Sequence, residues 1–269
     1  MIIMKQKKLL FPGLIVLLIL VVFLLSRKDK ESHVDGRISS DETIKLDLDG
    51  DGKKEKLLYS KGKLYINDKE YTDHLRQLGS MLEPVDEFIS ILDIDSNDKY
   101  VELAISTYGR SDDMESLFFY YDKGSLNYMG SIQGFPFEEN VRSIKKLEDN
   151  LLLAPYRLSI LQTWWGDAYY QVDDNRQLII KGQDYYDVDE FYTASLLQPI
   201  NLYQEPDKNS VASQIDVGSD LTFIKTDNIN WCQVRLEDGT EGWIFIDGNY
   251  IEDGTTLTED VFQGLYLYD

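Results

Sequence analysis

The chain contains little cysteine, histidine and proline for its length. Of 269 residues, one is cysteine, two are histidine and six are proline. A single cysteine, Cys232, excludes an intramolecular disulfide and a thiolate zinc site. It lies in the apolar stretch W-C-Q-V, where a small buried side chain is the expected role. The fold must therefore depend on packing of its core.

The scarcity of histidine bears on catalysis. His33 and His74 lie in polar segments, and the sequence contains no G-x-S-x-G, H-E-x-x-H or Cys–His arrangement. Carboxylate pairs of the glycosidase type are an alternative in so acidic a chain, but no pair stands out. We therefore expect a protein that is not an enzyme and has no catalytic residues, with a cell-wall hydrolase as the least favoured alternative.

Basic residues are also outnumbered. The chain has 27 Lys and Arg against 48 Asp and Glu, which gives a formal net charge of −21. Nucleic-acid binding depends on basic groups that release counterions from phosphates, so this charge excludes a nucleic-acid partner. A strongly acidic surface is compatible with cation binding and with solubility. The oligomeric state is not predicted.

Aromatic residues, in contrast, are plentiful. There are 18 Tyr, 11 Phe and 4 Trp, and these residues, with the β-branched ones, favour the half-buried surface of a sheet. The composition predicts an all-β fold class outside the N-terminal segment.

Residues 9–25 form an uncharged apolar run that three lysines precede. No small-x-small cleavage site follows it, and there is no cysteine here for lipid attachment. We predict an uncleaved signal anchor, a transmembrane helix over residues 1–26, with the C-terminal bulk outside the cell membrane. Basic residues just after the run weaken this orientation. A flexible polar spacer is expected over residues 27–43.

The middle region, residues 44–195, begins with an acidic loop suited to calcium. Asp47, Asp49 and Asp51 alternate, Gly52 permits a sharp turn, and Glu55 closes the loop. Calcium takes six to eight oxygen ligands, and this spacing converges carboxylates on one point. The candidate ligands are Asp47, Asp49, Asp51, the backbone carbonyl of Lys53, and Glu55. A turn rich in Asp and Gly for conformational reasons alone is the alternative.

This D-x-D-x-D-G-x-x-E loop resembles those of FG-GAP/VCBS-type repeats. In that family such loops bind calcium between two strands of an integrin-like propeller blade. The resemblance covers the loop and its flanking strands, and it implies calcium as the cofactor.

A second acidic loop, residues 93–102, departs from the pattern. Its glutamate, Glu102, comes one place later than Glu55 predicts, and Asp98 replaces the glycine. Either this loop carries one extra residue or it no longer binds metal. Its candidate ligands are Asp93, Asp95, Asn97, Asp98 and Glu102.

The spacing of the two loops lies within the ~40–50 residues of propeller blades. Turns at Asn67-Asp68, at Asp122-Lys123-Gly124 and at Asp174-Asn175, between alternating apolar stretches, predict three hairpins in this region. A closed propeller takes about four to eight blades, more than this region holds. We expect a partial, propeller-like β-domain over residues 44–195.

The C-terminal region, residues 196–253, carries a set of motifs. They are an L-Y-x-x-P opening at 202–206, W-x-x-V at 231–234, a turn at Asp238-Gly239, and a closing Gly242-Trp243. As a set they resemble a bacterial SH3-like (SH3b) domain, which implies a small β-barrel. A tail, residues 254–269, follows it.

Domains of that family bind cell-wall peptides or act as protein-interaction modules, with aromatic side chains lining the groove. The resemblance implies Tyr203, Trp231, Trp243 and Tyr250 as ligand-binding residues. A purely structural role for Trp231 and Trp243 is the alternative.

The sequence therefore predicts a membrane-anchored, extracytoplasmic binding protein of a Gram-positive bacterium. Its SH3-like domain would engage cell-wall peptide or a protein, and calcium would stabilise its β-domain. The alternative is a structural or regulatory partner of a membrane complex that has no wall ligand.

Overall fold

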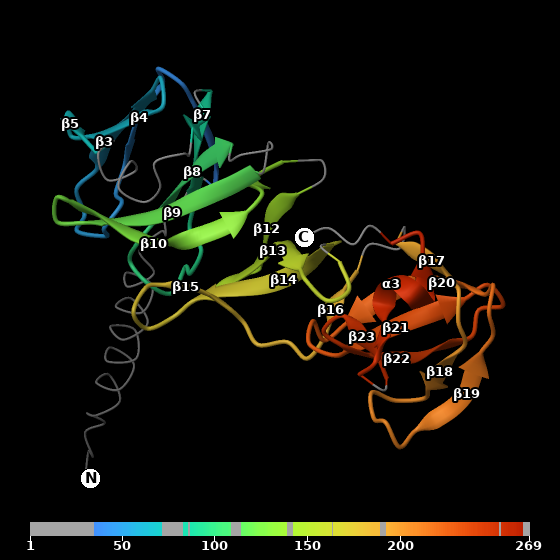
Figure 1. Ribbon diagram of the computed structural model, residues 1–269. Coiled ribbons are helices and arrows are strands. Elements are labelled where there is room, and N and C mark those ends of the chain that lie inside the picture. Colours follow the sequence, from blue (N-terminus) through green and yellow to red (C-terminus); the bar gives the residue numbers. More distant parts are fainter. Residues whose placement is uncertain are drawn as a thin grey trace, which may run out of the picture. The chain divides into compact units, whose positions relative to one another are not determined.

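The computed structural model describes residues 35–71, 83–85, 87–108, 114–138, 142–162, 164–188, 192–252 and 254–265. Within these ranges the protein is almost entirely β and forms four sheets (Figure 1). The one helix there, α3, is a single turn over Thr258–Val261. The residues from Asp35 onward form one compact unit.

The predicted fold class is wrong in its first element. No helix among the described residues is long and apolar enough to cross a membrane. Burial alternates along many strands of this part, as in Glu55–Ser60, where Glu55, Leu57 and Tyr59 are buried and the residues between them are partly exposed. The predicted transmembrane helix, residues 1–26, lies outside the described residues. The corrected fold class is an almost wholly β protein.

Three sheets contain antiparallel meanders of consecutive strands. The first has the order β2-β3-β4-β5. Its strands are β2 (Thr43–Leu46), β3 (Glu55–Ser60), β4 (Lys63–Ile66) and β5 (Lys69–Glu70). Lys61 and Gly62 link β3 to β4 with φ values of +50° and +69°. Two positive φ angles are what a two-residue hairpin turn needs to match the twist of its strands.

The second meander is β7-β8-β9-β10, with β1 beside β7 and β6 paired to β8. The strands are β1 (Gly36–Ser39), β6 (Glu83–Pro84), β7 (Phe88–Leu92), β8 (Glu102–Tyr108), β9 (Met114–Asp122) and β10 (Ser125–Gln133). Strand β8 is buried on both faces along most of its length. It is therefore a central strand of the middle region.

The third meander is β12-β13-β14-β15, and β11 pairs in parallel with β12. The strands are β11 (Phe135–Pro136), β12 (Ser143–Glu148), β13 (Leu151–Leu158), β14 (Trp164–Val172) and β15 (Leu178–Ile180). Along β14 every second side chain from Trp164 onward is buried. This alternation sends Trp164 inward and Trp165 to the outer face.

The C-terminal sheet is drawn from orange to red in Figure 1 and follows the path β19-β18-β22-β21-β20-β17-β25. Its main strands are β17 (Thr193–Leu196), β18 (Ile200–Tyr203), β19 (Val211–Ile215), β20 (Asp220–Thr226), β21 (Trp231–Leu236) and β22 (Glu241–Asp247). Short strands at its margins are β16 (Tyr186–Asp187), β23 (Tyr250–Ile251), β24 (Thr256–Leu257) and β25 (Phe262–Gln263). The segment before residue 196 and the tail both contribute strands to this sheet.

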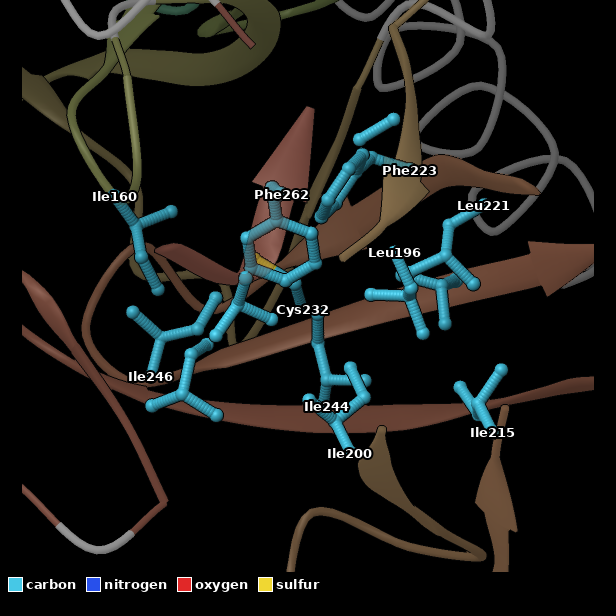
Figure 2. Close-up of a cluster of buried hydrophobic side chains, with 14 of the residues drawn as sticks. Ile160, Leu196, Ile200, Ile215, Leu221, Phe223, Cys232, Ile244, Ile246 and Phe262 are labelled. Carbon is cyan, nitrogen blue, oxygen red and sulfur yellow. The ribbon is translucent and has the colours of Figure 1, made fainter. Parts of the chain in front are cut away.

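The core of the C-terminal sheet is shown in Figure 2. Cys232 has no exposed surface and lies among Phe223, Ile244 and Phe262. Burial raises the pKa of the Cys232 thiol to about 12, so the sulfur is a neutral packing group, as the sequence predicts.

The same core extends into the third meander. Trp164 has no exposed surface, and its ring lies 5.0 Å from Phe223 and 5.5 Å from Tyr192 between centroids. Leu158, the last residue of β13, and Ile160, just after it, pack in the same cluster. A hydrogen bond of 2.8 Å from the Ser159 amide to Asn228 Oδ1 adds a polar link. The C-terminal sheet is therefore anchored on β13 and β14.

Trp164→Ala tests this shared core. Removing a fully buried indole should lower the free energy of unfolding by about 3–5 kcal/mol. The matched control is Trp165→Ala, one residue along on the outer face, for which we expect a loss below about 2 kcal/mol. Urea unfolding followed by circular dichroism measures both. Equal losses would show that Trp164 does not hold the sheet to the meander.

Candidate functional site

The first acidic loop joins β2 to β3 and gathers three carboxylates. Oxygens of Asp47, Asp49 and Glu55 lie within 4.8 Å of one another. Asp49 and Glu55 are buried, at 4% and 7% exposure. Burial raises the pKa of Glu55, and the neighbouring charges of Asp49 and Asp47 add to the rise. Three carboxyl groups this close repel one another when ionised.

Backbone amides supply the hydrogen bonds to this group. The Leu48 amide donates to Glu55 Oε2 at 3.0 Å, and the Gly52 amide donates to Asp47 Oδ2 at 2.9 Å. The other oxygen, Asp47 Oδ1, is buried and has no hydrogen-bond partner. An orphaned carboxylate oxygen beside two others is a position where a hard cation would fit.

Asp51, a further predicted ligand of this loop, lies outside the cluster. Asp51 is exposed, and its Oδ2 is 3.0 Å from Lys53 Nζ. Hydrogen bonds from Lys53 lower the pKa of Asp51. The structure therefore brings together three of the four predicted carboxylate ligands and leaves Asp51 paired with the Lys53 side chain on the outside of the loop.

The two acidic loops contact each other. The Val101 amide donates to the Leu48 carbonyl at 3.1 Å. Gly50 has a φ of +65°, and a Cβ there would lie 2.6 Å from the Lys99 carbonyl oxygen. Glycine is required at position 50 both for the backbone angle and for the close approach.

Gly50→Ala and Gly52→Ala form a matched pair. Both positions have positive φ, at +65° and +88°, but a Cβ on Gly52 meets nothing within 4 Å. We expect Gly50→Ala to lower the free energy of unfolding by about 1 kcal/mol or more beyond Gly52→Ala, because it also pushes the loops apart. Chemical denaturation measures this difference. Equal effects would mean that the loops do not pack.

The second acidic loop joins β7 to β8, and Glu102 takes the place that Glu55 holds in the first. The Ile94 amide donates to Glu102 Oε2 at 2.9 Å across eight residues, where the Leu48–Glu55 bond spans seven. The loop therefore carries one extra residue, which was one of the two interpretations of the offset. Glu102 has no exposed surface, and burial raises its pKa to about 7 against the lowering effects of the Ile94 amide and Arg176.

A guanidinium from the third meander lies in this second loop. Arg176 donates hydrogen bonds to Asp98 Oδ2 and to Glu102 Oε1. Its Cζ stands 4.3 Å from the Tyr100 ring centroid and 4.9 Å from that of Tyr120. Two of the predicted metal ligands, Asp98 and Glu102, are thus paired with a side-chain cation.

The other residues of the second loop hold its backbone. Asp95 Oδ1 accepts hydrogen bonds from the Asn97 amide at 3.0 Å and from its Nδ2 at 3.1 Å. The Asp93 amide donates to Asp35 Oδ1 at 2.8 Å, and the Asp93 carbonyl accepts a bond from Lys146 Nζ. These contacts give Asp95 and Asn97 the role of an Asx turn.

The outer face of the C-terminal sheet carries a row of aromatic side chains. Trp231 lies opposite Phe245, and Tyr203 lies opposite Trp243, so each pair shares one face. The Trp231 ring centroid is 5.2 Å from Tyr203 and 5.1 Å from Phe245, both edge to face. Tyr185, from the segment before β16, stands 4.9 Å from Trp243.

Exposure differs along this row. Trp231, Trp243 and Phe245 are half-buried, whereas Tyr203 is 4% exposed. Tyr250 is 40% exposed on β23, opposite Asp247, and makes no ring contact with the row among the described residues. Three of the four predicted ligand-binding aromatics therefore share one face, and Tyr250 stands apart.

The loop between β18 and β19 covers one end of the row. Lys208 Nζ lies 3.5 Å from the Phe245 ring centroid. Glu205 and Asp207 of the same loop are exposed, and Glu241 flanks the opposite end in an ion pair of 2.8 Å with Arg235. An aromatic surface with carboxylates beside it suits a ligand that carries apolar parts and amino groups.

The sequence analysis did not predict three of these residues, Phe245, Tyr185 and Arg176. Phe245 was within reach, because it lies two places after Trp243 and a strand repeats every two residues. Tyr185 lies outside the sequence motifs of the SH3-like module. Arg176 lies in a polar turn, 78 residues after its partner Asp98. Neither has a local signal that points to its partner.

Comparison with known proteins supports the C-terminal module. Residues 198–252 match the family described as bacterial SH3 domain, SH3_3, which confirms the predicted SH3-like part. The FG-GAP/VCBS resemblance of the acidic loops finds no support in the comparisons. No curated protein and no solved structure matches the chain.

Proposed function

We propose that this protein is a non-catalytic binding protein whose SH3 module engages peptide of the cell wall outside the cytoplasm. The observation that carries the proposal is the half-exposed row of Trp231, Phe245 and Trp243 on the outer face of the matched domain. Bacterial SH3 domains commonly bind peptide or wall partners. Flat rings that are partly exposed can pack against the chain of such a ligand.

The inner face of the same sheet supports a binding role for the outer one. Ile244 and Ile246 alternate with Trp243 and Phe245 along β22 and are 1% and 0% exposed. They fill the core and fix the strand, so the outward rings start from a rigid base. The packing of the core does not depend on tryptophan at the outward-facing positions. Binding of a ligand would explain why tryptophan occurs there.

Trp243→Ala tests this function. We expect the affinity of the full chain for purified peptidoglycan to fall about tenfold or more, since a central aromatic contact is worth at least ~1.4 kcal/mol. Ile229→Ala is the matched control, because Ile229 is 72% exposed in the same domain but lies in the β20–β21 turn. Co-sedimentation measures both. Unchanged binding of Trp243→Ala would reject the outer face as the site.

We also infer that the first acidic loop binds calcium. The donors are all carboxylate oxygens, which a hard cation prefers, and Asp47 Oδ1 lacks a partner within the cluster. Asp47, Asp49 and Glu55 would hold the ion. Calcium would neutralise their mutual repulsion and stabilise the contact between the two loops.

Calcium at 100 times its dissociation constant should therefore raise the free energy of unfolding of the full chain by about 2.7 kcal/mol, and with it the melting temperature. The double substitution Asp47→Asn/Asp49→Asn should abolish the rise. Asp238→Asn, which alters an exposed turn, should retain it. Because protons compete for Glu55, whose pKa is raised, the rise should shrink as the pH falls.

Differential scanning fluorimetry with and without calcium measures these shifts. A rise that survives the double substitution would place the ion elsewhere. No rise at millimolar calcium in the unaltered chain would reject the site.

A protein partner is a second candidate function. It rests on a cavity of about 540 Å³ on the third meander, lined by Leu147, Leu151, Tyr169 and Lys181 among others. Leu147 and Tyr169 are 50% and 39% exposed there. Loss of a co-purifying protein on Tyr169→Ser, with wall binding unchanged, would favour this function over the first.

A further inference from the structure

The two acidic loops share one architecture. Each ends in a glutamate at the first residue of a strand, Glu55 in β3 and Glu102 in β8. Each glutamate accepts the amide of the residue that follows the first aspartate of its loop, at 3.0 Å from Leu48 and 2.9 Å from Ile94. A carboxylate held in this way out of water needs positive charge nearby to remain ionised.

The loops differ in the groups that stabilise their carboxylates. In the first, backbone amides of Leu48 and Gly52 donate to the carboxylates. In the second, one guanidinium reaches two carboxylates, with Nη1 on Asp98 and Nη2 on Glu102. The Arg176 side chain is 16% exposed and that of Glu102 is 0% exposed. A single side-chain cation thus bridges two carboxylates of the second loop.

Hydrogen bonds within the β14–β15 turn fix the position of the Arg176 backbone. The turn between β14 and β15 is closed by the Arg176 amide on the Asp173 carbonyl and the Gln177 amide on Asp173 Oδ1, at 2.9 and 2.8 Å. Arg176 has a φ of +62°, which is uncommon for a residue with a side chain. The rings of Tyr100 and Tyr120 hold its guanidinium by cation–π contacts.

We propose that Arg176 is a built-in cation that fills the second acidic loop in place of a divalent metal ion. Arginine stays protonated at any physiological pH, and its planar fork binds two carboxylates at once. A divalent ion on Asp98 and Glu102 would have to displace it. This differs from the expectation that Asp93, Asp95, Asn97, Asp98 and Glu102 bind calcium.

The proposal gives the two loops separate roles. The first loop binds a cation from solution, whereas Arg176 holds the conformation of the second loop whether or not calcium is present. Because Arg176 belongs to the third meander, its ion pairs with Asp98 and Glu102 also connect that meander to the second. The first loop then packs, through the contact of Gly50 with Lys99, against a second loop whose conformation does not depend on metal.

Terbium luminescence tests the proposal, because Tb³⁺ replaces Ca²⁺ at oxygen sites and is sensitised by nearby tyrosines such as Tyr100 and Tyr120. All variants carry Asp47→Asn/Asp49→Asn in the full chain, so the first loop is disabled and the outcome is independent of calcium binding there. With Arg176 in place, we expect no saturable tyrosine-sensitised signal. Adding Arg176→Gln should create one saturable site per chain.

Two further variants complete the design. Arg176→Gln with Glu102→Gln should lose the new site, and Arg176→Lys, which keeps one positive charge, should not gain it. Calcium should raise the melting temperature of the Arg176→Gln variant and leave that of its Arg176 parent unchanged.

Either of two results would overturn the proposal. One is saturable terbium binding with Arg176 in place that Glu102→Gln removes, a result that holds even if Arg176→Gln does not fold. The other is a folded Arg176→Gln variant, by circular dichroism, that gains no site.

Discussion

The carboxylate of Glu102 has no exposed surface, and an ionised group in such a position is stable only among donors and cations. The Ile94 amide and the Arg176 guanidinium supply them. Since Arg176 belongs to the β14–β15 turn, this ion pair links two meanders. The same two meanders also share an apolar core, in which Phe118 and Leu152 are buried. The first loop rests in turn on the second, through the Val101–Leu48 hydrogen bond. The neutralised acids thus add polar links between sheets whose apolar side chains already pack in shared clusters.

The C-terminal sheet depends on a different interaction, the packing of apolar side chains across a shared core. Trp164 of the third meander fills a space against Phe223 and Tyr192. The sheet therefore has one face committed to this core. Its aromatic row lies on the other face, where Tyr185 from the preceding segment adds a ring to Trp243. A ligand on that face would meet the partly exposed rings of Trp231, Trp243 and Phe245.

Much of the C-terminal module could be predicted from the sequence, because its signals are local. Gly239 has a φ of +87° in the turn that Asp238-Gly239 predicts, and alternation along β22 separates core from surface residues. The similarity of the two acidic loops was also visible, and the offset of Glu102 is explained by one extra residue. These features depend on residues within a few positions of each other.

Long-range partners could not be predicted. Arg176 lies in a turn whose sequence, D-D-N-R, predicts only a hairpin, and its partners come from another sheet. Asp51 shares the spacing of its neighbours but pairs with Lys53, because a nearby ammonium is available on the outside of the loop. The apolar run of residues 9–25 predicted a transmembrane helix, and the described part of the chain has none.

The central claim is that each buried loop glutamate has its own cation, one from solution and one from the chain. A crystal structure of the protein grown with calcium, with anomalous scattering recorded for that ion, tests it most directly. The account predicts one anomalous peak, among Asp47, Asp49 and Glu55, with the Arg176 guanidinium still between Asp98 and Glu102. A peak in the second loop with Arg176 displaced, or no peak in the first, would contradict it.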